Sequence, residues 1–130
     1  MLNSVDGFGP SLSVGTGHLA VHILEDDAGV SDSLLMLFRN LGLEATAYPD
    51  AESFFETAKP KKDDTIIVDL LLPGISGATV ITWLKGLREP PRIVAISGQA
   101  QSAIERQLKD VGPVELIRKP LSIQTLSTIV

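Results

Sequence analysis

The chain has 130 residues, which is the size of one domain with a single core, and 44% hydrophobic with 21% charged residues is ordinary for a globular protein. Its net charge of -5 argues against direct nucleic-acid binding, because phosphate contacts need clustered lysine and arginine. The chain has no cysteine, which excludes disulfides and thiol chemistry and agrees with a cytoplasmic location, and no apolar run approaches the roughly 18 residues of a membrane span.

The first part of the chain differs in composition from the rest. Residues 1–17 are rich in glycine and serine and show no periodicity, so we expect a flexible lead-in before a domain at residues 18–130. Residues 19–24 are then mostly apolar and predict a buried strand that runs directly into the acidic residues 25–27. His22 within this strand is expected to be a core or edge histidine rather than a ligand.

Helical and strand patterns alternate along the remaining chain. Helices are expected at residues 29–41, 50–59, 77–87, about 104–111 and from 122 onwards, and strands at residues 43–48, 65–70, 92–96 and 114–117. The charged stretch that ends in Asp63 and Asp64 is expected to be a solvated connection. Because connections are short and crossovers right-handed, this order predicts an α/β fold: a five-stranded doubly wound parallel sheet, order 2-1-3-4-5, flavodoxin-like, with helices on both faces.

Asp69 interrupts the apolar run of the third expected strand. Burying an ionised carboxylate there costs several kcal/mol unless a cation, a hydrogen bond or the open end of the strand compensates it. Pro73, Gly74 and Gly77 end the regular structure soon afterwards, so Asp69 is expected at the carboxyl end of the strand, where ligands bind in open α/β sheets. The alternative is an aspartate that only bonds the following turn.

The carboxyl ends of parallel strands meet along one edge of the sheet. At that edge the sequence places Glu25, Asp26, Asp27, Asp69, Ser97 and Lys119. Crowded carboxylates repel one another, and a hard divalent cation relieves the repulsion, so the oxygen-only ligand set predicts Mg²⁺. A carboxylate can also attack a phosphoryl group, provided that a metal and a cation such as Lys119 absorb the developing charge while the Ser97 hydroxyl binds a phosphoryl oxygen.

With these motifs the chain from residue 19 to residue 130 resembles the receiver domains of bacterial two-component response regulators. The residues that carry the resemblance are Glu25-Asp26, Asp69 with Pro73 and Gly77 after it, Ser97-Gly98 and Lys119-Pro120. The phrases VHILEDD and LLPGISG look most like receivers coupled to helix-turn-helix output domains.

The resemblance implies roles for six residues of the sheet edge. It implies that Asp69 is the phosphoacceptor, that Ser97 is the switch hydroxyl and that Lys119 pairs with the phosphoryl group. It implies a metal site made of Asp26 as a direct ligand, Glu25 as an outer carboxylate, Asp69, and Leu71 through its backbone carbonyl.

The resemblance also implies a function and partners. The domain would take a phosphoryl group from a sensor histidine kinase or a histidine phosphotransfer protein and catalyse only its own phosphorylation and dephosphorylation. The face formed by the fourth helix, fifth strand and fifth helix would then change. An output domain after Val130, or a phosphorylation-dependent homodimer through that face, is expected as a further partner.

Two positions depart from the family pattern. Leu116 stands where the family usually has tyrosine or phenylalanine, and Glu25 replaces the first aspartate, which leaves Asp27 as an extra acid that only shapes the local field.

Other functions compete with the receiver interpretation. A haloacid-dehalogenase-like phosphatase would need a second aspartate where Leu71 stands, and a flavodoxin-like cofactor binder would need serine, threonine and glycine in place of the acidic run after the first strand. A phosphorylation-silent receiver that serves only for docking is the main alternative.

Overall fold

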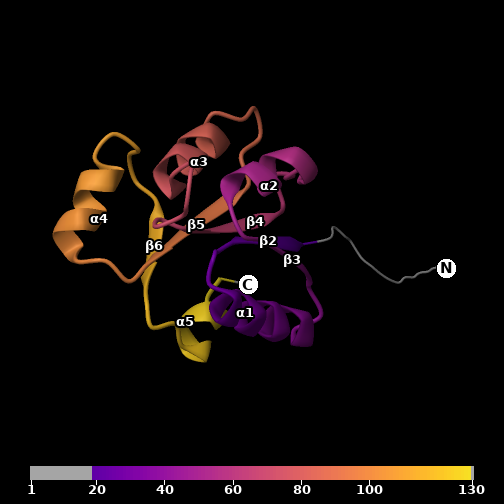
Figure 1. The fold of residues 1–130 in the computed structure, drawn as a ribbon. Helices are drawn as coiled ribbons and strands as arrows, with labels where there is room; N and C mark the ends of the chain where they lie inside the picture. Colours follow the sequence, from indigo (N-terminus) through magenta and orange to yellow (C-terminus); the bar gives the residue numbers. More distant parts are fainter. Residues whose placement is uncertain (1–18, 130) are drawn as a thin grey trace.

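The computed structural model describes residues 19–129, in which five parallel strands form one sheet between two layers of helices (Figure 1). The strands are β2 (Ala20–Leu24), β3 (Glu44–Tyr48), β4 (Thr65–Asp69), β5 (Arg92–Ser97) and β6 (Glu115–Arg118). Their order across the sheet is β3-β2-β4-β5-β6, which confirms the predicted 2-1-3-4-5 order. The expected lead-in at residues 1–17 lies outside the described residues.

Five helices connect these strands and cover both faces of the sheet. They are α1 (Ala28–Asn40), α2 (Ala51–Thr57), α3 (Gly77–Lys85), α4 (Gln101–Leu108) and α5 (Ile123–Ser127). Helices α1 and α5 lie on one face of the sheet, and α2, α3 and α4 lie on the other (Figure 1). The buried side chains of each group of helices belong to the core cluster on their own face. Within residues 19–129 no helix is both long and apolar enough to cross a lipid bilayer.

The central strand β4 is buried along its whole length. Ile66 and Val68 face the layer of α2, α3 and α4, whereas Ile67 faces the layer of α1 and α5. Because both faces are covered, an apolar side chain is favoured at every position, which explains why this strand shows no polar alternation.

The helix ends follow local side chains. Asp50 and Ser122 cap α2 and α5, since their side chains accept the backbone N–H groups of Ser53 and Thr125. Helix α2 ends at Thr57 rather than at residue 59, because a residue that precedes a proline, here Pro60, is disfavoured in the helical conformation.

The prediction that Asp64 is solvated is wrong. Its side chain is buried, and its Oδ2 lies 3.1 Å from Nε2 of His22 and accepts the N–H of Lys61 at 3.0 Å. The other ring nitrogen of His22 lies 2.9 Å from the Tyr48 hydroxyl. His22 is therefore a hydrogen-bonded core histidine, as expected, and it supplies the polar partner that allows Asp64 to be buried.

The helix expected at residues 29–41 ends one residue earlier than predicted, before Leu41. Helix α1 ends at Asn40, and the chain turns at Gly42, whose φ is 84°. This glycine conformation redirects the backbone, so that Leu41 is 51% exposed.

Candidate functional site

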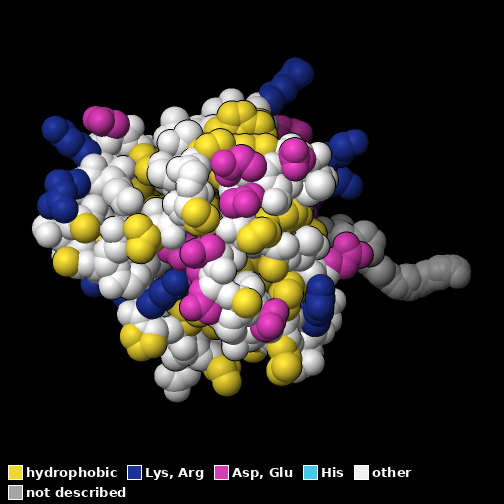
Figure 2. All heavy atoms as spheres, in the orientation of Figure 1, with side chains coloured by type: hydrophobic (Ala, Val, Ile, Leu, Met, Phe, Trp, Pro, Cys, Tyr) yellow, Lys and Arg dark blue, Asp and Glu magenta, His cyan; other side chains and the backbone are white. Residues whose placement is uncertain are grey.

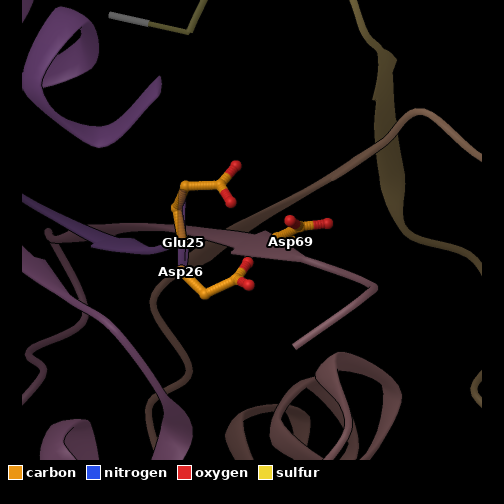
Figure 3. Close-up of side chains that lie close together, drawn as sticks. All are labelled: Glu25, Asp26 and Asp69. Atoms are coloured by element: carbon orange, nitrogen blue, oxygen red, sulfur yellow. The ribbon is translucent and has the colours of Figure 1, made fainter. Parts of the chain in front are cut away.

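Three carboxylates meet where β2 and β4 end (Figure 3). Glu25 and Asp26 follow β2, and Asp69 is the last residue of β4; one oxygen of each lies within 4.8 Å of the others. The parallel register aligns Leu24 with Val68, so the next residues along both strands emerge side by side. Glu25 and Asp69 are buried, and Asp26 is exposed. These three residues are the ones in the described chain that could hold a metal ion together.

Lys119 supplies the cation of the site. It follows β6, and its Nζ lies 2.7 Å from Oε1 of Glu25 and 3.1 Å from Oδ2 of Asp69. When all three acids are ionised, one ammonium faces three carboxylates. The cluster then keeps an excess of negative charge, which favours binding of a further cation.

The environment changes the proton affinity of both Glu25 and Lys119. Burial raises the pKa of Glu25 to about 7, because it outweighs the opposing effects of Lys119 and of the Asp27 N–H, and the Asp69 carboxylate raises this pKa further. Burial lowers the pKa of Lys119, but its contacts with Glu25 and Asp69 outweigh that effect, so the net direction is upward. Lys119 therefore stays charged, whereas Glu25 carries a proton part of the time near neutral pH.

Asp69 is held by groups on both sides of its carboxylate. Oδ1 accepts the N–H of Leu71 at 3.0 Å, while Oδ2 contacts Lys119. Gly77 lies against the backbone of Asp69, and a Cβ atom added to it would clash with the Asp69 carbonyl oxygen. Only glycine allows the first residue of α3 to approach so closely, which is a role for Gly77 that its place in the sequence motif does not explain.

Ser97 ends β5, next to the strand that carries Asp69, and its side chain is buried. Its Oγ accepts the N–H of Gln99 at 3.0 Å and donates to Oε1 of Gln99 at 3.3 Å. Its carbonyl accepts the N–H of Lys119 at 2.8 Å. The hydroxyl is thus bonded within its own loop in this structure.

Asp27 has a structural role beyond the extra negative charge expected from the sequence. Its Oδ1 accepts the N–H of Val30 at 3.1 Å and caps α1, while its own N–H donates to Oε2 of Glu25 at 3.1 Å. The sequence signal for the cap was an aspartate two residues before the helix expected at residues 29–41. Asp27 therefore links the start of α1 to the acidic cluster.

A largely apolar groove of about 830 Å³ lies between α1 and α5 beside this site. Its lining includes Lys119 and Asp27 at the acidic end, and the exposed side chains of Met36 and Ile123 further along. Figure 2 shows acidic side chains gathered over the carboxyl edge of the sheet, and hydrophobic side chains exposed over α1 and α5. The groove thus brings an apolar surface up to the charged residues.

Several known proteins are similar to this chain in sequence. A family model described as the response regulator receiver domain matches residues 21–130. Nodulation protein W of Bradyrhizobium diazoefficiens is 31% identical over 106 residues, which are 82% of this chain and 47% of that protein. Sensory transduction protein RegX3 of Mycolicibacterium smegmatis is 31% identical over 108 residues, which are 82% of this chain and 46% of that protein. The chain thus spans about half the length of these relatives.

Solved structures agree at the level of the fold. The structure of FixJ-N has a TM-score of 0.73 at 23% identity and covers 88% of this chain and 91% of that chain. Chemotaxis protein CheY4 of Vibrio cholerae has a TM-score of 0.72 at 17% identity and covers 88% of this chain and 100% of that chain.

Proposed function

This chain belongs to the response regulator receiver domain family, and we propose from that premise that it accepts a phosphoryl group on Asp69 with Mg²⁺ bound beside it. The observation that carries the proposal is the position of the Asp69 carboxylate, which lies with Glu25 and Asp26 in one cluster and 3.1 Å from the Lys119 ammonium. A nucleophilic carboxylate, a set of oxygen ligands and a fixed cation are the groups that phosphoryl transfer to an acid requires.

The acidic cluster fits a hard divalent cation. Asp26 is exposed and free to bind directly, while the buried Glu25 and Asp69 offer further oxygens, and we assign the Leu71 carbonyl as the backbone ligand. Bound Mg²⁺ would neutralise charge on the transferring phosphoryl group. A haloacid-dehalogenase-like activity is less well supported, because the exposed Leu71 offers no acid or base two residues after Asp69.

Asp69, Lys119 and Ser97 each have a separate role in the proposed phosphoryl transfer. An Asp69 oxygen forms a bond to phosphorus as the bond from phosphorus to the donor's histidine nitrogen breaks, and the product is an acyl phosphate. Lys119 pairs with a phosphoryl oxygen, a charge-assisted contact that replaces its present bond to Oδ2. Ser97 donates its hydroxyl to another phosphoryl oxygen after leaving Gln99.

We assign the phosphodonor to a sensor histidine kinase or a histidine phosphotransfer protein that docks over the groove between α1 and α5. The groove reaches Lys119, and exposed apolar side chains of both helices line it, so a docked partner buries apolar surface while its phosphohistidine faces Asp69. The relatives are about twice as long, which supports an output domain elsewhere in the protein; a homodimer through α4, β6 and α5 is the other candidate for the output.

Phosphorylation by acetyl phosphate tests the assignment directly. With Mg²⁺ present, intact-mass measurement should show one added phosphoryl group on the parent domain and none on Asp69→Asn. Asp63→Asn is the matched control, because it makes the same substitution at an exposed acid outside the site. Equal labelling of Asp69→Asn contradicts the assignment, and an unlabelled parent favours the phosphorylation-silent docking function.

A further inference from the structure

Arg118 ties the loop after β5 to β6. Its Nη2 donates to the Gln99 carbonyl oxygen at 2.8 Å, and its Nη1 donates to Oε1 of Gln101 at 2.7 Å. Arg118 is aligned with Ser97 in the parallel register, so the guanidinium reaches across the segment that follows the Ser97 hydroxyl. The proposed phosphoryl transfer assigns no role to this contact.

The same contact fixes the start of α4. The N-cap residue Ala100 makes no side-chain capping bond, and Ile104 is the buried residue of this helix. Gln101, the first residue of α4, also donates to Oε2 of Glu105 at 3.2 Å, so the link from Arg118 continues one turn into the helix. Arg118, from β6, therefore holds the start of α4, which has no side-chain cap of its own.

The loop that Arg118 holds also binds the Ser97 hydroxyl. If this hydroxyl turns to a phosphoryl oxygen, the Gln99 N–H loses its acceptor, and an unsatisfied donor is unfavourable unless the loop moves to find another partner. Arg118 opposes such a movement, because it holds the carbonyl of the same residue.

We propose that Arg118 is a positioning residue that stabilises the resting position of the loop between β5 and α4, and that the loop leaves Arg118 when Ser97 engages a phosphoryl group. This inference rests on the proposed function of Asp69. A contact that exists only in the resting state stabilises that state. Removing the contact therefore shifts the equilibrium toward the state in which the loop is released and Ser97 binds the phosphoryl group. Arg118 would thereby link β6 to α4 in a chain whose Leu116 has no polar group to do so.

The test measures binding of beryllofluoride, a stable mimic of the phosphoryl group, by calorimetry at saturating Mg²⁺. Arg118→Ala should bind it about two- to tenfold more tightly than the parent, the range expected for charge-assisted hydrogen bonds at a partly solvated site. Gln101→Ala, which removes one of the two bonds, should show a smaller gain, and so should Arg118→Lys. Because beryllofluoride is anionic, the loss of a positive charge alone would weaken its binding. Tighter binding by Arg118→Ala would therefore indicate release of the loop.

A second measurement does not depend on phosphoryl chemistry. In the metal-free domain, hydrogen exchange of the backbone amides of residues 99–105 should be faster in Arg118→Ala than in the parent. Arg106→Ala is the control for both measurements, because it removes an exposed arginine of α4 that does not hold the loop, and it should leave exchange and affinity unchanged.

The outcomes separate this inference from the proposed function. If the parent binds beryllofluoride and Arg118→Ala binds it equally or more weakly, the inference is overturned and the proposed function stands. If the parent does not bind it, the proposed function fails, and unchanged exchange in Arg118→Ala overturns the positioning role as well. An equal gain in affinity for Arg106→Ala also overturns the inference.

Discussion

Glu25 is a buried acid whose proton affinity links the site to the stability of the fold. Its pKa is about 7 in the folded domain and returns to its ordinary value near 4.5 in the unfolded chain. Between these values the folded domain holds a proton that the unfolded chain has released. The free energy of unfolding contributed by this group therefore falls as pH rises from about 4.5 to about 7, and stays level above that.

Removing this charge should stabilise the metal-free domain at high pH. We expect Glu25→Gln to raise the free energy of unfolding at pH 8 by as much as about 3 kcal/mol and to have little effect at pH 4, since each pKa unit is about 1.4 kcal/mol. Urea denaturation with a chelator present at both pH values measures this. Glu56→Gln, at an exposed position, is the control, and a gain of equal size at both pH values would contradict the linkage.

The neighbouring acids Asp26 and Asp27 should separate into a ligand and a cap. Asp26→Ala should abolish Mg²⁺ binding with little loss of stability, whereas Asp27→Ala should lower stability by about 1 kcal/mol through loss of the α1 cap. Asp27→Asn keeps a capping oxygen and removes the charge, so it should be nearly as stable as the parent. Calorimetry and thermal denaturation check both effects; retained binding in Asp26→Ala would mean that Asp26 is not a ligand.

Helices α3 and α4 lie on the same face of the sheet but are held differently. Helix α3 buries Gly77, Val80, Ile81 and Leu84 and has the Ser76 cap, whereas α4 buries Ile104 and has no side-chain cap. Besides Arg118, a bond of 3.4 Å from Gln107 to the Leu70 carbonyl ties α4 to the loop after Asp69. The element nearest the proposed switch is thus the more weakly anchored of the two.

This difference predicts an order of local opening. Native-state hydrogen exchange of the parent domain should show α4 amides opening at a lower free energy than α3 amides, because fewer buried contacts are lost when α4 opens. The two helices are compared within one sample, so α3 is an internal control. Equal protection of both helices would contradict the view that α4 is the element most easily displaced.

Across the whole molecule, the features that depend on local sequence or on the order of the strands were predicted well. The strand order, the capping role of Asp50 and the place of Asp69 at a strand end follow from periodicity, capping chemistry and the parallel arrangement. The gathering of acids at one edge follows from the same topology.

Contacts between distant side chains could not be predicted in the same way. Asp64 is buried because a histidine 42 residues earlier binds it, and the Arg118 contact depends on how β6 lies beside the loop that follows β5. Both depend on side-chain positions that are fixed only after the sheet and helices have packed. The close approach of Gly77 to the Asp69 backbone is another such contact. The sequence indicates only that a glycine begins this helix.

The division of the helices between two faces bears on which of the proposed partners the domain could bind at the same time. The groove assigned to the phosphodonor belongs to the layer of α1 and α5, whereas α4 packs in the opposite layer. A donor seated on the first layer leaves α4 accessible, so a partner that reads α4 need not wait for the donor to depart. If both partners bind in this way, the carboxyl edge of the sheet, where Asp69 ends β4, would be the part of the domain that links the two layers.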